Sequence, residues 1–125
     1  MLVLALKGEK KEAILFKERK IGLKSPELLT IAKGQYRDKS EKQIRGNGFV
    51  VDSLEAALWS FWTTDTFEQA ILTAVNLGED ADTTAAICGQ IAGAHYGIEG
   101  IPKGWLEKLH MQEEILRMAE RLAEF

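Results

Sequence analysis

The sequence lacks the features of a disulfide-bonded or membrane-spanning protein. Cys88 is the only cysteine among 125 residues, so no disulfide can form within the chain, and we expect a reducing, cytoplasmic setting. The apolar start at residues 1–6 is interrupted by Lys7 and is far shorter than the ~20 residues of a membrane helix. It also lacks a basic lead-in and a small-residue cleavage site. We therefore expect neither a membrane segment nor a signal peptide.

Segments rich in β-branched and aromatic residues are also scarce. The longest is residues 48–51, which is too short to build a sheet. A hydrophobic content of 46% and a charged content of 28% are ordinary for a globular protein, and 125 residues can bury one core. The sequence thus predicts an all-α fold, a compact helical bundle formed by a single domain over residues 1–125.

Helical periodicity is strongest in the middle of the chain. Apolar residues repeat twice at the 0, 3, 4, 7, 8 spacing of one helical face: Leu54, Ala57, Leu58, Phe61 and Trp62, then Phe67, Ala70, Ile71, Ala74 and Val75. Asp52 with Glu55 fits a capping box for the first helix, and either Asp65 or Thr66 can cap the second. We expect an antiparallel helical hairpin.

Further helices are predicted on either side of this hairpin. Ser25 followed by Pro26 is typical of a helix start. Residues 83–96 are rich in small residues, and close backbone approach would explain Gly89 and Gly93 one turn apart. Residues 111–125 form an amphipathic helix whose expected inward residues are Ile115, Leu116, Met118, Ala119 and Leu122.

A turn rich in carboxylates precedes the small-residue helix. Asp80 and Asp82 are two residues apart, and Thr83 adds a hydroxyl next in line. Mg²⁺ prefers carboxylate, hydroxyl and water oxygens in near-octahedral array. These three residues are therefore candidate metal ligands.

A structural explanation of the same turn stays open. Asp82 can simply cap the helix, with Glu79 and Asp80 as favourable charges near its positive end. An EF-hand is excluded, because the sixth position is Ala85 rather than glycine and the twelfth is Ile91 rather than glutamate. A cap accounts for one acid, whereas three acids in four residues repel one another and favour a counter-ion.

Two other features are expected to be structural. Residues 1–45 hold twelve Lys or Arg against six Asp or Glu, but the two signs are interleaved, which indicates a solvated helix face rather than a nucleic-acid site. Cys88 and His95 share a helical face but lie two turns apart, about 10 Å, too far for a nucleophile and its base.

Residues around the acidic turn resemble those of a known family, the ADP-ribosylglycohydrolases. The resemblance covers most of the chain and is carried by these segments: Gly48-Phe49-Val50-Val51-Asp52-Ser53-Leu54-Glu55-Ala56-Ala57-Leu58-Trp59, Asn76-Leu77-Gly78-Glu79-Asp80-Ala81-Asp82-Thr83, Ala85-Ala86-Ile87, Gly89, Ala92-Gly93-Ala94, Tyr96-Gly97 and Ile101-Pro102 through Trp105.

The resemblance implies an all-helical, Mg²⁺-dependent hydrolase. Such enzymes use a two-metal centre to cleave the bond between the ribose anomeric carbon of ADP-ribose and a modified side chain or other acceptor. The residues matching Asp80, Asp82 and Thr83 are metal ligands in that family, and the implied partner is an ADP-ribosylated protein or an ADP-ribose derivative.

The chain departs from the family in length. Family members are more than twice as long, and a Thr-Asp-Asp segment in their N-terminal half supplies the remaining metal ligands; no such segment occurs here. We therefore expect a partial domain that lacks the N-terminal half and holds Mg²⁺ weakly by itself. Its site would be completed by a complementing chain or in a homo-oligomer. The alternative is a truncated, non-catalytic helical module.

Overall fold

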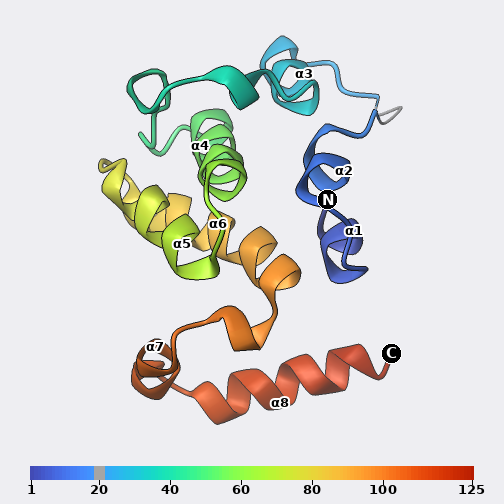
Figure 1. The fold of residues 1–125 in the computed structure, drawn as a ribbon, viewed down its shortest axis with the longest axis vertical. Helices are drawn as coiled ribbons and strands as arrows, with labels where there is room; N and C mark the ends of the chain where they lie inside the picture. The colour runs from blue at the N-terminus through green and yellow to red at the C-terminus, as the bar shows by residue number, and fades with distance from the viewer. Residues whose placement is uncertain (19–21) are drawn as a thin grey trace.

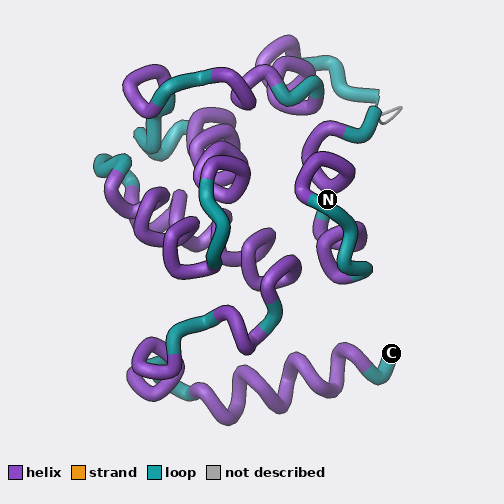
Figure 2. Tube along the Cα trace, viewed as in Figure 1, coloured by secondary structure: helices purple, strands orange, loops and turns teal. Residues whose placement is uncertain are grey.

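The computed structural model describes residues 1–18 and 22–125, and within these ranges all its regular elements are helices, with no strand (Figures 1 and 2). This confirms the all-α prediction. The helices are α1 (Leu2–Leu6), α2 (Lys11–Phe16), α3 (Pro26–Ala32), α4 (Val50–Thr63), α5 (Phe67–Asn76), α6 (Ala81–Tyr96), α7 (Lys103–Lys108) and α8 (Gln112–Ala123), with 3₁₀ turns η1 (Gln35–Asp38), η2 (Glu41–Gln43) and η3 (Ile98–Gly100).

Helix α6 forms the centre of the packing. It contacts α4, α5 and α1, and α4 also packs on α5, so the predicted hairpin of α4 and α5 is confirmed. Phe61 and Cys88, on α4 and α6, are fully buried in this core. Three helices pack closely around α6, which explains why small residues occur on all sides of this helix.

Of the two helix caps predicted for the hairpin, one is confirmed and one is wrong. Thr66 caps α5 as expected, since its hydroxyl oxygen accepts from the backbone N–H of Gln69 at 3.1 Å. The predicted cap at Asp52 is wrong, because α4 begins at Val50. The Asp52 carboxylate instead accepts from the Asn47 side-chain amide at 2.9 Å.

The predicted close backbone approach at Gly89 and Gly93 is also wrong. A Cβ added at Gly89 would lie 3.6 Å from the Ile71 side chain, and one at Gly93 would lie 3.9 Å from Phe67. Both distances are ordinary van der Waals contacts. Neither helical position therefore needs glycine for space.

Replacing Gly89 or Gly93 by alanine is accordingly expected to stabilise the fold. Each change removes the entropic cost of glycine in a helix interior, about 0.5–1 kcal/mol. Thermal unfolding followed by circular dichroism measures the gain. Gly100→Ala serves as the control, because its Cβ would lie 2.8 Å from the Tyr96 Cβ. A loss of stability in either helical variant would contradict this packing.

Helix α8 stands apart from the bundle (Figure 1). The expectation that its apolar residues face inward is wrong here: α8 has no buried residue, and Ile115, Met118 and Leu122 are 43%, 51% and 72% exposed. The amphipathic pattern is present, but nothing within the described residues covers its apolar side.

Candidate metal centre

The acidic turn is a strained bend directly before α6. Gly78 has φ +77° and Glu79 has φ +54°, the left-handed region that non-glycine residues rarely adopt. Helix α6 begins at Ala81, two residues earlier than predicted. Asp80 occupies the cap position, but its side chain makes no capping hydrogen bond. Asp82 lies inside the first turn, so the explanation of Asp82 as the cap is wrong.

The side chains of Asp80 and Asp82 lie close enough to interact. The neighbouring Asp80 side chain lowers the pKa of Asp82, and the backbone N–H of Thr83 lowers it further. That N–H donates to Asp82 Oδ1 at 3.0 Å. Asp82 and Thr83 are exposed and Asp80 is half-buried. The turn therefore presents two adjoining anionic groups and a hydroxyl toward the outside of the molecule.

A glycine-rich loop, residues 46–49, packs against this turn. The backbone N–H of Asp80 donates to the carbonyl of Gly46 at 2.7 Å. Gly48 has φ +80°, and a Cβ there would lie 2.9 Å from Asp80 Oδ2. The loop thus fixes both the backbone and the side chain of Asp80. Sequence analysis missed this role, although the glycines at 46 and 48 are the signal of a close approach.

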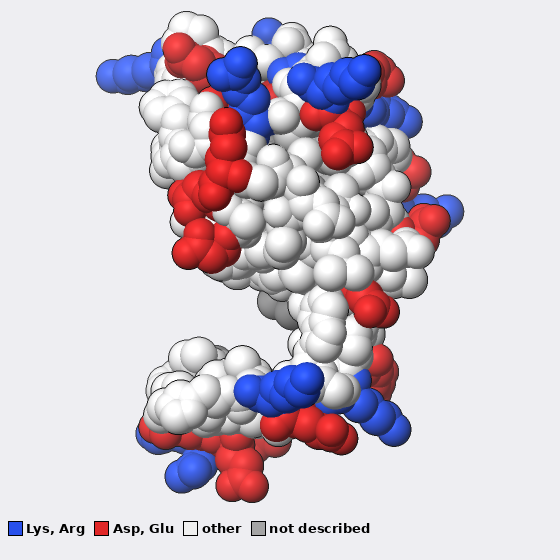
Figure 3. All heavy atoms as spheres, turned by 90° about the vertical axis from the view of Figure 1, so that its left-hand side faces the viewer, with Lys and Arg blue, Asp and Glu red and all other residues white. Residues whose placement is uncertain are grey.

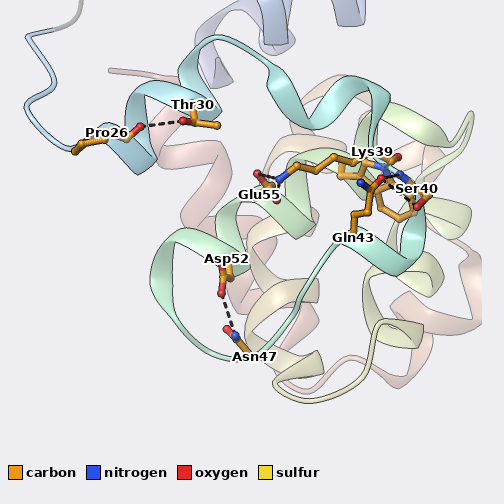
Figure 4. Close-up of polar contacts among 9 residues, drawn as sticks. Pro26, Thr30, Lys39, Ser40, Gln43, Asn47, Asp52 and Glu55 are labelled. Atoms are coloured by element: carbon orange, nitrogen blue, oxygen red, sulfur yellow. Dashed lines mark hydrogen bonds and ion pairs between the residues drawn. The ribbon is translucent and has the colours of Figure 1, made fainter.

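Polar contacts hold the segment that carries this loop (Figure 4). Lys39 pairs with Glu55 of α4 at 2.8 Å, and Asn47 donates to Asp52 on the same helix at 2.9 Å. The Asn47 side-chain oxygen also accepts from the backbone N–H of Phe49 at 3.0 Å. Phe49 and Val50 are 59% and 72% exposed. They follow Gly48, which packs against the Asp80 carboxylate, so exposed apolar residues lie next in sequence to that contact.

Gly48→Ala is expected to disturb the candidate metal centre selectively. The new Cβ would meet the Asp80 carboxylate and would require a left-handed backbone, so either the loop or the carboxylate must move. We expect Mn²⁺ affinity, measured by titration, to fall about tenfold or more, a loss of about 1.4 kcal/mol. Gly104→Ala, with open space around the added Cβ, is the matched control. Equal affinities in the two variants would contradict the contact.

The donor set fits a hard divalent cation in part. Asp80, Asp82 and Thr83 offer carboxylate and hydroxyl oxygens, the ligands that Mg²⁺ prefers. The adjacent Thr84 hydroxyl is buried without a hydrogen-bond partner near Gly46, a second polar oxygen that sequence analysis did not single out. However, the part of the chain that the structure describes holds no group of three or more His, Cys, Asp or Glu residues placed to hold one metal ion. A cation at this turn would need further oxygen ligands besides these side chains.

A hollow of about 500 Å³ lies at the opposite end of α6 and is lined by Lys11, Asp65, His95 and Tyr96 among others. The Lys11 ammonium donates to the carbonyls of Phe61, at 2.6 Å, and of Thr64. Desolvation lowers the pKa of Lys11 and also that of His95. Lys11 therefore satisfies the last carbonyls of α4, a structural task.

Cys88 is positioned as a core residue. Its Sγ lies 3.6 Å from the carbonyl of Ala70, and burial raises the pKa of the thiol to about 12. A thiol with this pKa is protonated at neutral pH and is a poor nucleophile. This agrees with the expectation that Cys88 and His95 do not form a catalytic pair.

The structure is an all-helical bundle with an Asp-x-Asp-Thr turn ahead of a helix rich in small residues. Comparison with known proteins gives the family to which this arrangement belongs. The ADP-ribosylglycohydrolase family model matches residues 2–125. The chain belongs to the ADP-ribosylglycohydrolase family.

Several relatives show the same relation. The chain is 55% identical over 95 residues to the ADP-ribosylarginine hydrolase Tri1 of Serratia proteamaculans, covering 76% of this chain and 26% of that protein. It is 46% identical over 121 residues to the protein of that name from Pseudomonas putida, covering 97% and 32%. The ADP-ribosyl-[dinitrogen reductase] glycohydrolase of Rhodospirillum rubrum is 41% identical over 92 residues, covering 70% and 31%.

A solved structure gives the same result for the fold. A chain of an "ADP-ribosylglycohydrolase-related protein complex" superposes with a TM-score of 0.80 and 43% identity over 90% of this chain, but only 39% of that chain is matched. This chain thus spans about a third of the length of the proteins it matches. Among the described residues, no helix combines the length and apolar character needed to cross a membrane.

Proposed function

We propose that this chain is the part of an ADP-ribosyl hydrolase that carries the Asp-x-Asp-Thr half of a Mg²⁺ centre. The observation that supports this most directly is that Asp80 and Asp82 lie together at one turn. The Asp80 side chain makes no capping hydrogen bond there, so its oxygens are not used by the helix. Two relatives are named ADP-ribosylarginine hydrolases, which favours ADP-ribosylated arginine as the substrate class. The proposed setting is the cytoplasm, where the single thiol stays reduced.

The reaction is hydrolysis of a glycosidic bond. Water adds its oxygen to the anomeric carbon of the ribose, the bond from that carbon to the acceptor nitrogen breaks, and the nitrogen takes up a proton. The products are ADP-ribose and the free arginine side chain. Mg²⁺, when bound, supplies a Lewis acid that orients ribose hydroxyls and lowers the pKa of coordinated water.

The residues of this chain have three tasks in that reaction. Asp80, Asp82 and Thr83 would hold the cation. The loop at residues 46–49 keeps Asp80 in place through its contacts with the Asp80 N–H and carboxylate. The exposed ring of Phe49 offers an apolar face on which the ribose or the acceptor side chain can pack. The remaining ligands would come from the part of the fold that this chain does not span.

A chimeric enzyme tests the proposal. In the Pseudomonas putida relative, the 121 matched residues are replaced by those of this chain, and ADP-ribose release from ADP-ribosylated arginine is followed with and without Mg²⁺. We expect Mg²⁺-dependent release by the chimera and none by this chain alone or by the relative without the segment.

The second candidate is a truncated, non-catalytic helical module. The observation that favours it is the absence, among the described residues, of a complete set of metal-binding side chains. A chimera that folds and binds ADP-ribose but releases nothing would support this module and overturn the hydrolase.

A further inference from the structure

Lys11 and His95 meet at the same two aromatic rings, although they lie far apart in the sequence. The Lys11 ammonium is 4.6 Å from the centre of the Phe61 ring and 5.3 Å from the centre of the Tyr96 ring. The His95 ring packs edge-to-face with the same two rings, at centre-to-centre distances of 5.4 Å and 4.8 Å. A cation of α2 and a titratable group of α6 therefore share one aromatic cluster.

The Lys11 ammonium joins α2 to the end of α4. It donates to the carbonyl of Phe61 at 2.6 Å and to that of Thr64, which also accepts from the Tyr96 hydroxyl at 3.4 Å. The last carbonyls of a helix need such donors, because no further helical turn supplies them. Since α1 and α2 lie within residues 1–16, this contact fastens that part of the chain to the core.

The surroundings of His95 favour a neutral ring. Its Nδ1 atom is buried and has no hydrogen-bond partner among the described residues, so a proton on this atom would lack an acceptor. Burial lowers the pKa of His95, and the positive charge of Lys11 lowers it further. A protonated His95 would place a second cation beside the Lys11 ammonium.

Few other charges act on His95. The remaining residues with titratable side chains that line the same hollow are Glu9, Lys10, Glu12, Asp65 and Tyr96. Helix α1 carries no titratable side chain, and neither Glu68 of α5 nor Glu99 of η3 lines the hollow. Figure 3 shows the side of the bundle away from α1 and α2, where charged side chains gather toward the top and the edges and the middle is uncharged. Among the groups around His95, Lys11 is the one whose charge lowers its pKa.

We propose that His95 makes the attachment of α1 and α2 to the bundle sensitive to acid. When His95 takes up a proton, its charge repels that of Lys11, and the Lys11 ammonium leaves the carbonyls of α4 for water. Below the ordinary histidine pKa of about 6.5, the detached state binds this proton more readily than the attached state. The attachment is therefore complete above about pH 6.5 and weakens as the pH falls below that value.

Hydrogen exchange of backbone amides tests the inference on the whole chain. Protection factors, corrected for the intrinsic pH dependence of exchange, are compared between α2 and α5 at about pH 7.5 and about pH 5. In the wild type, the α2 amides, such as that of Ile14, are expected to lose at least about threefold in protection at the lower pH, while those of α5 keep theirs. His95→Gln, whose side chain does not titrate, is expected to abolish this loss.

His110→Gln is the matched control, because His110 is the other histidine of the chain and is exposed. We expect this variant to lose protection in α2 as the wild type does. An equal loss in α2 and α5 would overturn the inference, because acid would then unfold the bundle as a whole. A loss in His95→Gln as large as in the wild type would overturn it too.

A second measurement needs no variant. In an NMR titration of the wild type, the signals of the His95 ring and of the α2 amides are expected to change together, with one midpoint below about pH 6.5. Titration of His95 without a change in the α2 amides would contradict the proposed link between its charge and the Lys11 contact.

Discussion

Asp80→Asn in the chimeric enzyme is expected to reduce Mg²⁺-dependent ADP-ribose release by at least about a hundredfold. The amide keeps the shape of the side chain and one oxygen, but it removes the negative charge that a hard cation requires. Asp82→Asn should have the same effect, because the two carboxylates adjoin at the same turn. The measurement is the initial rate of ADP-ribose release over a range of Mg²⁺ concentrations. Excess Mg²⁺ is expected to restore part of the activity of the variants.

Glu79→Gln is the matched control. Glu79 lies in the same turn, and Glu79→Gln removes the same charge, but the Glu79 side chain is exposed and is not one of the proposed metal ligands. We expect its rate to stay within about twofold of the wild type, as for an ordinary surface change. A hundredfold loss of rate in Glu79→Gln would show that the turn acts only through its overall charge. Full activity in Asp80→Asn would show that this carboxylate does not bind the cation.

Cys88 is expected to resist thiol reagents until the protein unfolds. Burial raises its pKa from 9.0 to about 12, which lowers the thiolate fraction at pH 8 about a thousandfold. Because Cys88 is the only cysteine, the absorbance from a disulfide reagent such as dithionitrobenzoate reports on this residue alone. Labelling should be at least about a thousandfold slower in buffer than in denaturant.

An engineered exposed thiol provides the internal control. Arg117→Cys places a cysteine on the charged side of α8, where labelling should be fast in the native protein. The variant should therefore show one fast and one slow reaction of equal amplitude. Rapid labelling of Cys88 in the wild type, at a rate near that of the exposed thiol, would contradict its position between α4, α5 and α6.

Local patterns predicted much of the bundle. The spacing of apolar residues identified α4 and α5, and the Thr66 cap of α5 was among the two expected. The start of α4 was mispredicted because Asp52 fits a capping box by type and spacing. Only the fold reveals that Asn47 contacts the Asp52 carboxylate while the helix begins two residues earlier.

The candidate site was predictable where its residues are close in sequence. Asp80, Asp82 and Thr83 were identified by their spacing in a glycine-containing turn. The loop at residues 46–49 was not, because about thirty residues separate it from the turn and the contact with Asp80 forms only on folding. The position of α8 was also unpredictable: its sequence specifies an apolar face but not what covers that face.

The central claim is that the turn between α5 and α6 binds a divalent cation through Asp80 and Asp82. The most direct measurement is a crystal of this chain or of the chimera soaked in Mn²⁺, with anomalous diffraction recorded to locate the metal. The account predicts a peak between the two carboxylates, about 2 Å from an oxygen of each. Density showing Asp80 and Asp82 turned apart with no peak between them, while Mn²⁺ is bound elsewhere, would contradict it.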